Sequence, residues 1–158
     1  MTNSHLPRQP SAGRGSAARP TGAIAVAVAL LSWVALVWLG VGAPRHTHPL
    51  VYFGLIFLGA GSFAVLLAGT GALTVHARAI AGRLTPSFVT GVRNLVLAMW
   101  WCAIVVDVIG CVIVFGTAGR GGTAGLGAAL ALAVPLIAVL TVAVGALTSF
   151  AVRRSYRF

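Results

Sequence analysis

The chain has 158 residues, of which 59% are hydrophobic and only 8% are charged, and its formal net charge is +10. An average soluble domain has about 25% charged residues. Because so few polar side chains cannot cover the apolar mass, the composition excludes a water-soluble globular protein. All basic residues apart from His are Arg, and they lie between apolar runs rather than together on one soluble face. We therefore expect no binding to nucleic acid.

Four long stretches of the sequence are nearly free of charge. Residues 20–44, 46–77 and 121–152 contain no Asp, Glu, Lys or Arg, and residues 94–119 contain only Asp107. Each stretch exceeds the roughly 20 residues that a helix needs to cross the hydrocarbon. Their apolar residues do not alternate as in barrel strands, so helices are the remaining way to satisfy the backbone in lipid. We predict four spans, at about 22–42, 50–76, 88–116 and 124–151.

The predicted fold is an all-α membrane protein, an up-down bundle of four transmembrane helices. The first apolar stretch is longer than the roughly 7–15 residues of a signal-peptide core, so we expect it to stay in the mature protein. Residues 1–21 are rich in Pro, Ser, Gly and Arg and are predicted to be a disordered cytoplasmic segment. The four-helix domain follows at 22–152, and a short basic cytoplasmic tail at 153–158.

The arginines predict how the bundle is oriented. Nine of the eleven precede the first span, flank the link between the second and third spans, or follow the fourth span, whereas only Arg45 and Arg120 lie on the other side. Basic residues are retained in the cytoplasm during insertion. We therefore expect both termini to be cytoplasmic and the chain to be a multi-pass protein of the cytoplasmic membrane.

The one acidic residue, Asp107, falls near the middle of the third span. An ionisable group there costs about 2.5–3.5 kcal/mol on insertion scales, so it should face the protein interior and be neutral. Ser32, Ser62 and Thr141 fall near the middle of their own spans, and we predict that they form an intramembrane polar layer with Asp107. Two interpretations stay open. We favour a buried structural hydrogen bond over a proton relay or a substrate contact.

Small residues recur every four positions in the second and fourth spans. The second span carries Ala60, Ala64, Ala68 and Ala72. The fourth span carries a looser series, made of Gly125, Ala129, Ala133, Thr141, Gly145 and Ser149. Residues four apart share a helix face, and small ones let helix backbones approach closely. We predict that these faces contact other helices, within the bundle, in another membrane protein or in a second copy of the chain.

The remaining residues form no catalytic pattern. His46 and His48 lie one residue apart in a turn bracketed by prolines, but a metal site needs more ligands, and the sequence nearby has no Cys, Asp or Glu. Cys102 and Cys111 are predicted on opposite faces of one helix, so we expect no disulfide between them. One carboxylate, with no phosphate-binding loop and no Ser/His/Asp set, favours a protein without catalytic activity, cofactor or metal.

The link between the second and third spans reads Gly82-Arg83-Leu84-Thr85-Pro86-Ser87-Phe88. Gly82 predicts the end of one helix, while Thr85 and Pro86 predict the N-cap and first residue of the next. With the spans around it, over about residues 50–152, this link resembles that of uncharacterised four-span bacterial inner-membrane proteins. Genes of that family often neighbour small helix-turn-helix regulators. The acidic C-terminal tail of many members is missing here, and the resemblance implies the fold but no activity.

The sequence thus favours a non-catalytic accessory or interacting subunit of a membrane complex. The alternative is a small transporter or proton-coupled carrier that uses Asp107. The use of Arg without any Lys indicates a bacterium with a GC-rich genome.

Overall fold

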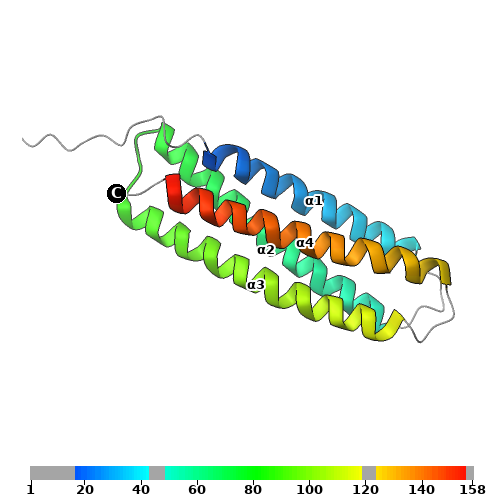
Figure 1. Cartoon of the computed structure of the whole chain (residues 1–158). Coiled ribbons are helices and arrows are strands. Elements are labelled where there is room, and N and C mark those ends of the chain that lie inside the picture. Colours follow the sequence, from blue (N-terminus) through cyan, green and yellow to red (C-terminus); the bar gives the residue numbers. More distant parts are fainter. Residues whose placement is uncertain (1–16, 43–48, 119–123, 156–158) are drawn as a thin grey trace, which may run out of the picture.

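The computed structural model describes residues 17–42, 49–118 and 124–155, and these form four long helices. They are α1 (Ala18–Gly42), α2 (Pro49–Ile80), α3 (Pro86–Ala118) and α4 (Ala124–Ser155). No strand occurs in the described ranges. The helices pack side by side in one bundle (Figure 1), which confirms the predicted all-α four-helix fold. All four are long and apolar enough to cross a membrane, so the chain is a multi-pass membrane protein.

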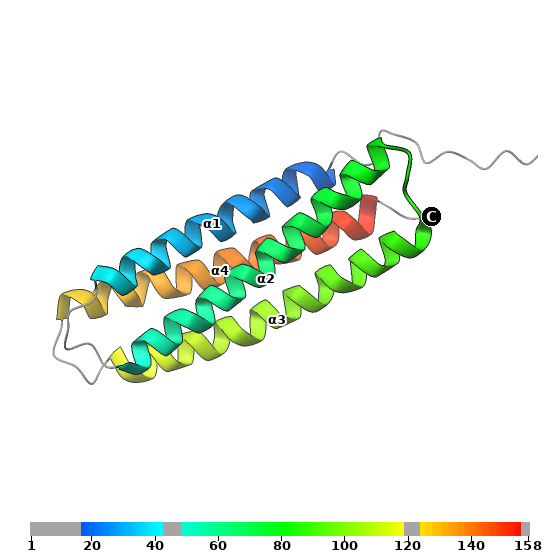
Figure 2. The same ribbon diagram turned by 180° about the vertical axis from the view of Figure 1, so that it is seen from behind.

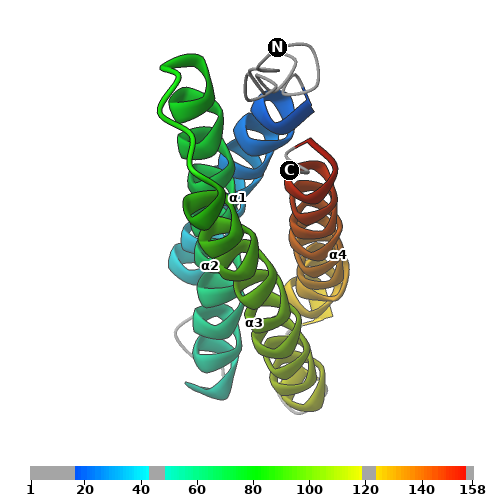
Figure 3. The same cartoon turned by 90° about the vertical axis from the view of Figure 1, so that its left-hand side faces the viewer.

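Successive helices run in opposite directions. The start of α1, the end of α2, the start of α3 and the end of α4 meet at one end of the bundle (Figure 1). Figure 3 turns that end toward the viewer, with α4 to the right of α2 and α3. Every arginine that the structure describes lies toward this end, which we call the arginine-rich end: Arg19, Arg78, Arg83, Arg93, Arg153 and Arg154. Its cytoplasmic location stays a prediction.

The helices extend further than the charge-free runs predicted. Helix α1 begins at Ala18, so the last residues of the segment expected to be disordered are helical, and α4 continues through Arg153 and Arg154 to Ser155, where a tail was expected. The predicted limits followed hydrophobicity, whereas a helix continues for as long as its backbone bonds are favourable. Arg is a good helix former and can keep its charged end in water beside the membrane. Residues 1–16 and 156–158 lie outside the described residues.

The link between α2 and α3 has the predicted capping geometry. Gly82 has a φ of +66°, the left-handed conformation that ends a helix at low cost for glycine. The amide of Arg83 donates to the carbonyl of Arg78 over 3.0 Å, as in a Schellman motif. At the start of α3, the amide of Phe88 donates to the hydroxyl oxygen of Thr85. The amide of Val89 donates to the carbonyl oxygen of the same residue. The predicted helix stop and N-cap are thus confirmed.

Helix α2 is the centre of the packing, because the two most extensive helix contacts are those of α2 with α3 and with α1. Figure 2 shows it running obliquely, from beside the end of α3 to beside the start of α1. Glycines allow the closest approaches at both places. A Cβ on Gly110 of α3 would lie 2.9 Å from the carbonyl oxygen of Gly54, and a Cβ on Gly69 would lie 2.9 Å from that of Gly22 in α1. Such distances leave no room for a side chain, so these glycines fix the helix spacing.

Candidate intramembrane polar site

Asp107 lies inside the bundle in the second half of α3, with 1% of its surface exposed. The hydroxyl of Thr141, on α4, donates to its Oδ2 over 2.5 Å. The same hydroxyl lies 3.0 Å and 2.9 Å from the carbonyl oxygens of Ile137 and Ala138 in its own helix. Its single proton therefore has alternative acceptors. When the carboxyl group is neutral, it can itself donate to Thr141 while Thr141 donates along α4.

Gly61 of α2 provides the space for the second oxygen of the carboxyl group. A Cβ at Gly61 would overlap Oδ1 of Asp107 and would lie 2.6 Å from its Cγ. The carboxyl group therefore packs directly on the backbone of α2 while it is hydrogen-bonded to α4. The carboxyl group thus connects α2, α3 and α4 at one point. Gly61 is not among the predicted site residues, although its spacing of seven residues from Gly54 places both glycines on the face of α2 that packs on α3.

The two serines of the predicted polar layer lie in the interior but are not hydrogen-bonded to Asp107. The Ser32 hydroxyl donates to the carbonyl of Val28 in its own helix over 2.8 Å. Ser62 is fully buried, and its Oγ has no hydrogen-bond partner among the described residues; the same holds for Oδ1 of Asp107. Only Asp107 and Thr141, of the four predicted residues, are therefore joined directly.

Apolar side chains enclose this polar pair along the bundle axis. Toward the end opposite the arginines, the interior is filled by a cluster of aliphatic residues: Leu36, Leu39, Val51, Leu55, Leu58, Val114, Val134 and Ile137. A second cluster, with smaller side chains, is made of Ala25, Ala64, Val65, Ala103 and Val144. The described arginines lie near the arginine-rich end and make no ion pair with Asp107. Among the described residues, Asp107 therefore has a hydrogen bond to a hydroxyl group and no ion pair.

The small-residue series of α2 is a contact face over most of its length. Ala64, Ala68 and Ala72 are buried, as predicted, but Ala60 is exposed, so the prediction was wrong there. Four residues advance the helix by about 400°, so the series drifts by about 40° per step and leaves the contact face at one end. On α4, the series is buried at Thr141, Gly145 and Ser149. Ala133 is half-buried, and the burial of the earlier members Gly125 and Ala129 lies outside the described part.

Two tryptophans add hydrogen bonds between helices. The indole N–H of Trp100, on α3, donates to the carbonyl of Val142 on α4 over 3.1 Å, and the ring fills the space left by Gly145. The indole N–H of Trp33, on α1, donates to the carbonyl of Gly59 on α2, also over 3.1 Å. Both rings use backbone carbonyls that already belong to a helix. These bonds leave no signal in the sequence, since the acceptors are backbone carbonyls rather than side chains.

The sulfur and imidazole groups form no further site in the described residues. Cys102 is exposed, Cys111 is half-buried, and both thiols are free, as expected. No group of three or more His, Cys, Asp or Glu side chains gathers in the ranges that the structure describes. His46 and His48 lie outside those ranges.

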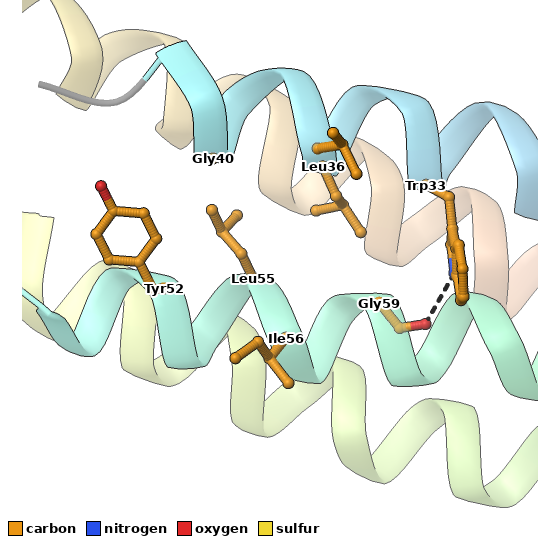
Figure 4. Close-up of a pocket in the computed structure, with 8 residues that line it drawn as sticks. Trp33, Leu36, Gly40, Tyr52, Leu55, Ile56 and Gly59 are labelled. Atoms are coloured by element: carbon orange, nitrogen blue, oxygen red, sulfur yellow. Dashed lines mark hydrogen bonds between the residues drawn. The ribbon is translucent and has the colours of Figure 1, made fainter.

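A hollow of about 290 Å³ lies on the surface between α1 and α2, in the half of the bundle away from the arginines. Figure 4 shows residues from both helices around it. Its lining is almost wholly apolar, with Trp33 at one end and Tyr52 at the other: Trp33, Leu36, Val37, Gly40, Tyr52, Leu55, Ile56 and Gly59.

Comparisons with protein families, with curated proteins and with solved structures found no match to this chain. The resemblance to four-span bacterial membrane proteins stays a prediction from the sequence.

Proposed function

We propose that the chain is a non-catalytic protein of the cytoplasmic membrane that acts as an accessory subunit of a larger membrane complex. The enclosure of Asp107 supports this proposal. Its carboxyl group packs on Gly61, accepts a hydrogen bond from Thr141, and lies among apolar side chains. A polar group placed in this way stabilises helix association. Interactions with other molecules then fall to the outer surface of the bundle, as in a subunit that works by contact.

The subunit proposal is tested by purification at native expression level. A tagged chain, extracted in mild detergent, should carry one other membrane protein in a fixed ratio, identified by mass spectrometry. The matched control is a tagged membrane protein of similar size and abundance, which should not carry that partner. The proposal is contradicted if the chain is purified without any other protein, or only with copies of itself.

One observation favours a second candidate, a small proton-coupled carrier. Oδ1 of Asp107 and Oγ of Ser62 are buried polar atoms without a hydrogen-bond partner in the described residues, and such atoms call for an explanation. Intramembrane acids of this kind are used as proton carriers in transporters. In this reading the carboxyl group would take up and release a proton during transport.

The variant Asp107→Asn separates the two candidates. Asn keeps the shape and hydrogen-bonding capacity of the neutral acid but cannot release a proton. For the subunit, we expect the partner to co-purify with the Asn variant and growth to match wild type at equal expression. Thr141→Val is the control, because it removes the hydrogen bond and keeps the acid. A folded Asn variant that fails to support growth, beside a Thr141→Val variant that succeeds, would reject the structural role and favour the carrier.

A further inference from the structure

The hollow between α1 and α2 exists because two glycines leave it open. Helices α1 and α2 approach closely at Gly22 and Gly69, toward the arginine-rich end. In the other half, a Cβ on Gly40 would meet nothing within 4 Å, and one on Gly59 would first meet Leu36, at 4.0 Å. The space of about 290 Å³ is thus an open feature of the surface rather than part of the helix contact.

The hollow is apolar along its length, and an aromatic side chain lies at each end. Trp33 lies at the end of the hollow nearer the middle of the bundle, and its indole N–H is already hydrogen-bonded to the carbonyl of Gly59 (Figure 4). At its other end stands Tyr52, in the first turn of α2, whose hydroxyl makes no hydrogen bond with other described residues. Tyrosines in that position of a membrane helix lie at the level of the lipid head groups. The distance along α1 from Trp33 to Gly40 is about 10.5 Å, parallel to the direction in which lipid chains run.

The rim faces the surroundings of the bundle. Val37 and Ile56 are 63% and 65% exposed, on helices that are apolar enough to cross a membrane. Close helix contacts use small residues, whereas large exposed side chains, Trp33 among them, surround Gly40 and Gly59 here and leave a narrow depression. A flexible acyl chain can enter between such side chains.

We propose that this hollow binds one acyl chain of a bilayer phospholipid, with the ester region of the lipid beside Tyr52. The Tyr52 hydroxyl, at one end of the apolar lining, matches the ester region, and the apolar surface between Tyr52 and Trp33 matches the chain. The site is independent of Asp107 and of the subunit proposal, and it makes the α1–α2 face a lipid-binding face.

The test uses the full chain in vesicles of dioleoylphosphatidylcholine that contain a phosphatidylcholine with a diazirine in its acyl chain. After illumination, peptide mapping locates the attached lipid. We expect several-fold more label on the segments 33–40 and 52–59 than on the lipid-exposed segment 105–112 of α3. Gly59→Leu places a side chain in the hollow and should remove this excess. Gly116→Leu is the matched control, since it makes the same change at an exposed position of α3 with open space around it.

The outcomes are distinct. Gly40→Leu fills the hollow from α1 and replaces Gly59→Leu if that variant fails to fold. Uniform labelling of all lipid-exposed segments, or an excess that survives both filling variants, overturns the proposal. It is also overturned by a photocrosslink between two chains through these segments, or by an excess seen with a diazirine fatty acid and absent with the phospholipid.

Discussion

Replacing Gly61 with alanine tests whether the carboxyl group of Asp107 really occupies the surface of α2. The added Cβ would overlap Oδ1, while Thr141 holds the other oxygen from the opposite side, so the carboxyl group or a helix must shift. Overpacking of this kind costs about 1–3 kcal/mol. Alanine also gains up to about 1 kcal/mol over glycine in helix propensity. Gly59→Ala, two residues away, gains the same propensity and meets no atom closer than 4.0 Å.

The difference between the two variants therefore isolates the overpacking. We expect Gly61→Ala to have a free energy of unfolding about 1–3 kcal/mol below that of Gly59→Ala. The assay is unfolding in mixed micelles with a rising fraction of dodecyl sulfate, followed by circular dichroism. In an Asp107→Ala background the carboxyl group is gone, so the penalty at Gly61 should vanish, which is a coupling between neighbours. Equal stability of the two glycine variants, or a penalty unchanged by Asp107→Ala, would refute the reasoning.

The remaining predictions use other parts of the bundle. Ala68→Leu should destabilise the protein by about 1–3 kcal/mol, whereas Ala60→Leu should be nearly neutral, because Ala68 is buried and Ala60 is exposed; equal unfolding curves would contradict this. Trp100→Phe should cost about 0.6 kcal/mol for the lost hydrogen bond to α4, and a stability equal to wild type would show that the bond contributes nothing. A reporter active only outside the cytoplasm should give a signal when inserted within residues 43–48 and none when fused after Phe158; the reverse pattern would overturn the orientation.

The fold could be predicted because lipid leaves the backbone few choices. Charge-free runs longer than a bilayer span require helices, and short links require antiparallel neighbours. The turn between α2 and α3 could also be predicted, since the effects of Gly82 and Thr85 on the backbone are local and do not depend on the other helices. The exact helix ends could not be predicted from the sequence. Arg153 and Arg154 interrupt the hydrophobic pattern without interrupting the helix.

The contacts between helices were predicted less well. The burial of Asp107 followed from the cost of an acid in lipid, and Thr141 was found as its partner because it lies at a similar depth. Depth alone does not give the rotation of a helix, so the bond of Ser32 to its own backbone and the exposure of Ala60 could not be foreseen. A series that repeats every four residues has to rotate away from a straight contact.

The site around Asp107 depends on shape as much as on hydrogen bonding. An interhelical hydrogen bond inside a membrane contributes about 0.6 kcal/mol on average and at most about 1.7 kcal/mol. Adding a single carbon at Gly61 is expected to cost as much or more, because the carboxyl group already fills that space. The acid therefore acts on the fold in two ways, as the acceptor for Thr141 and as the side chain that fills the surface of α2. Because Asn has the same shape as the neutral acid, it should preserve both roles, and proton release is the one property that it removes.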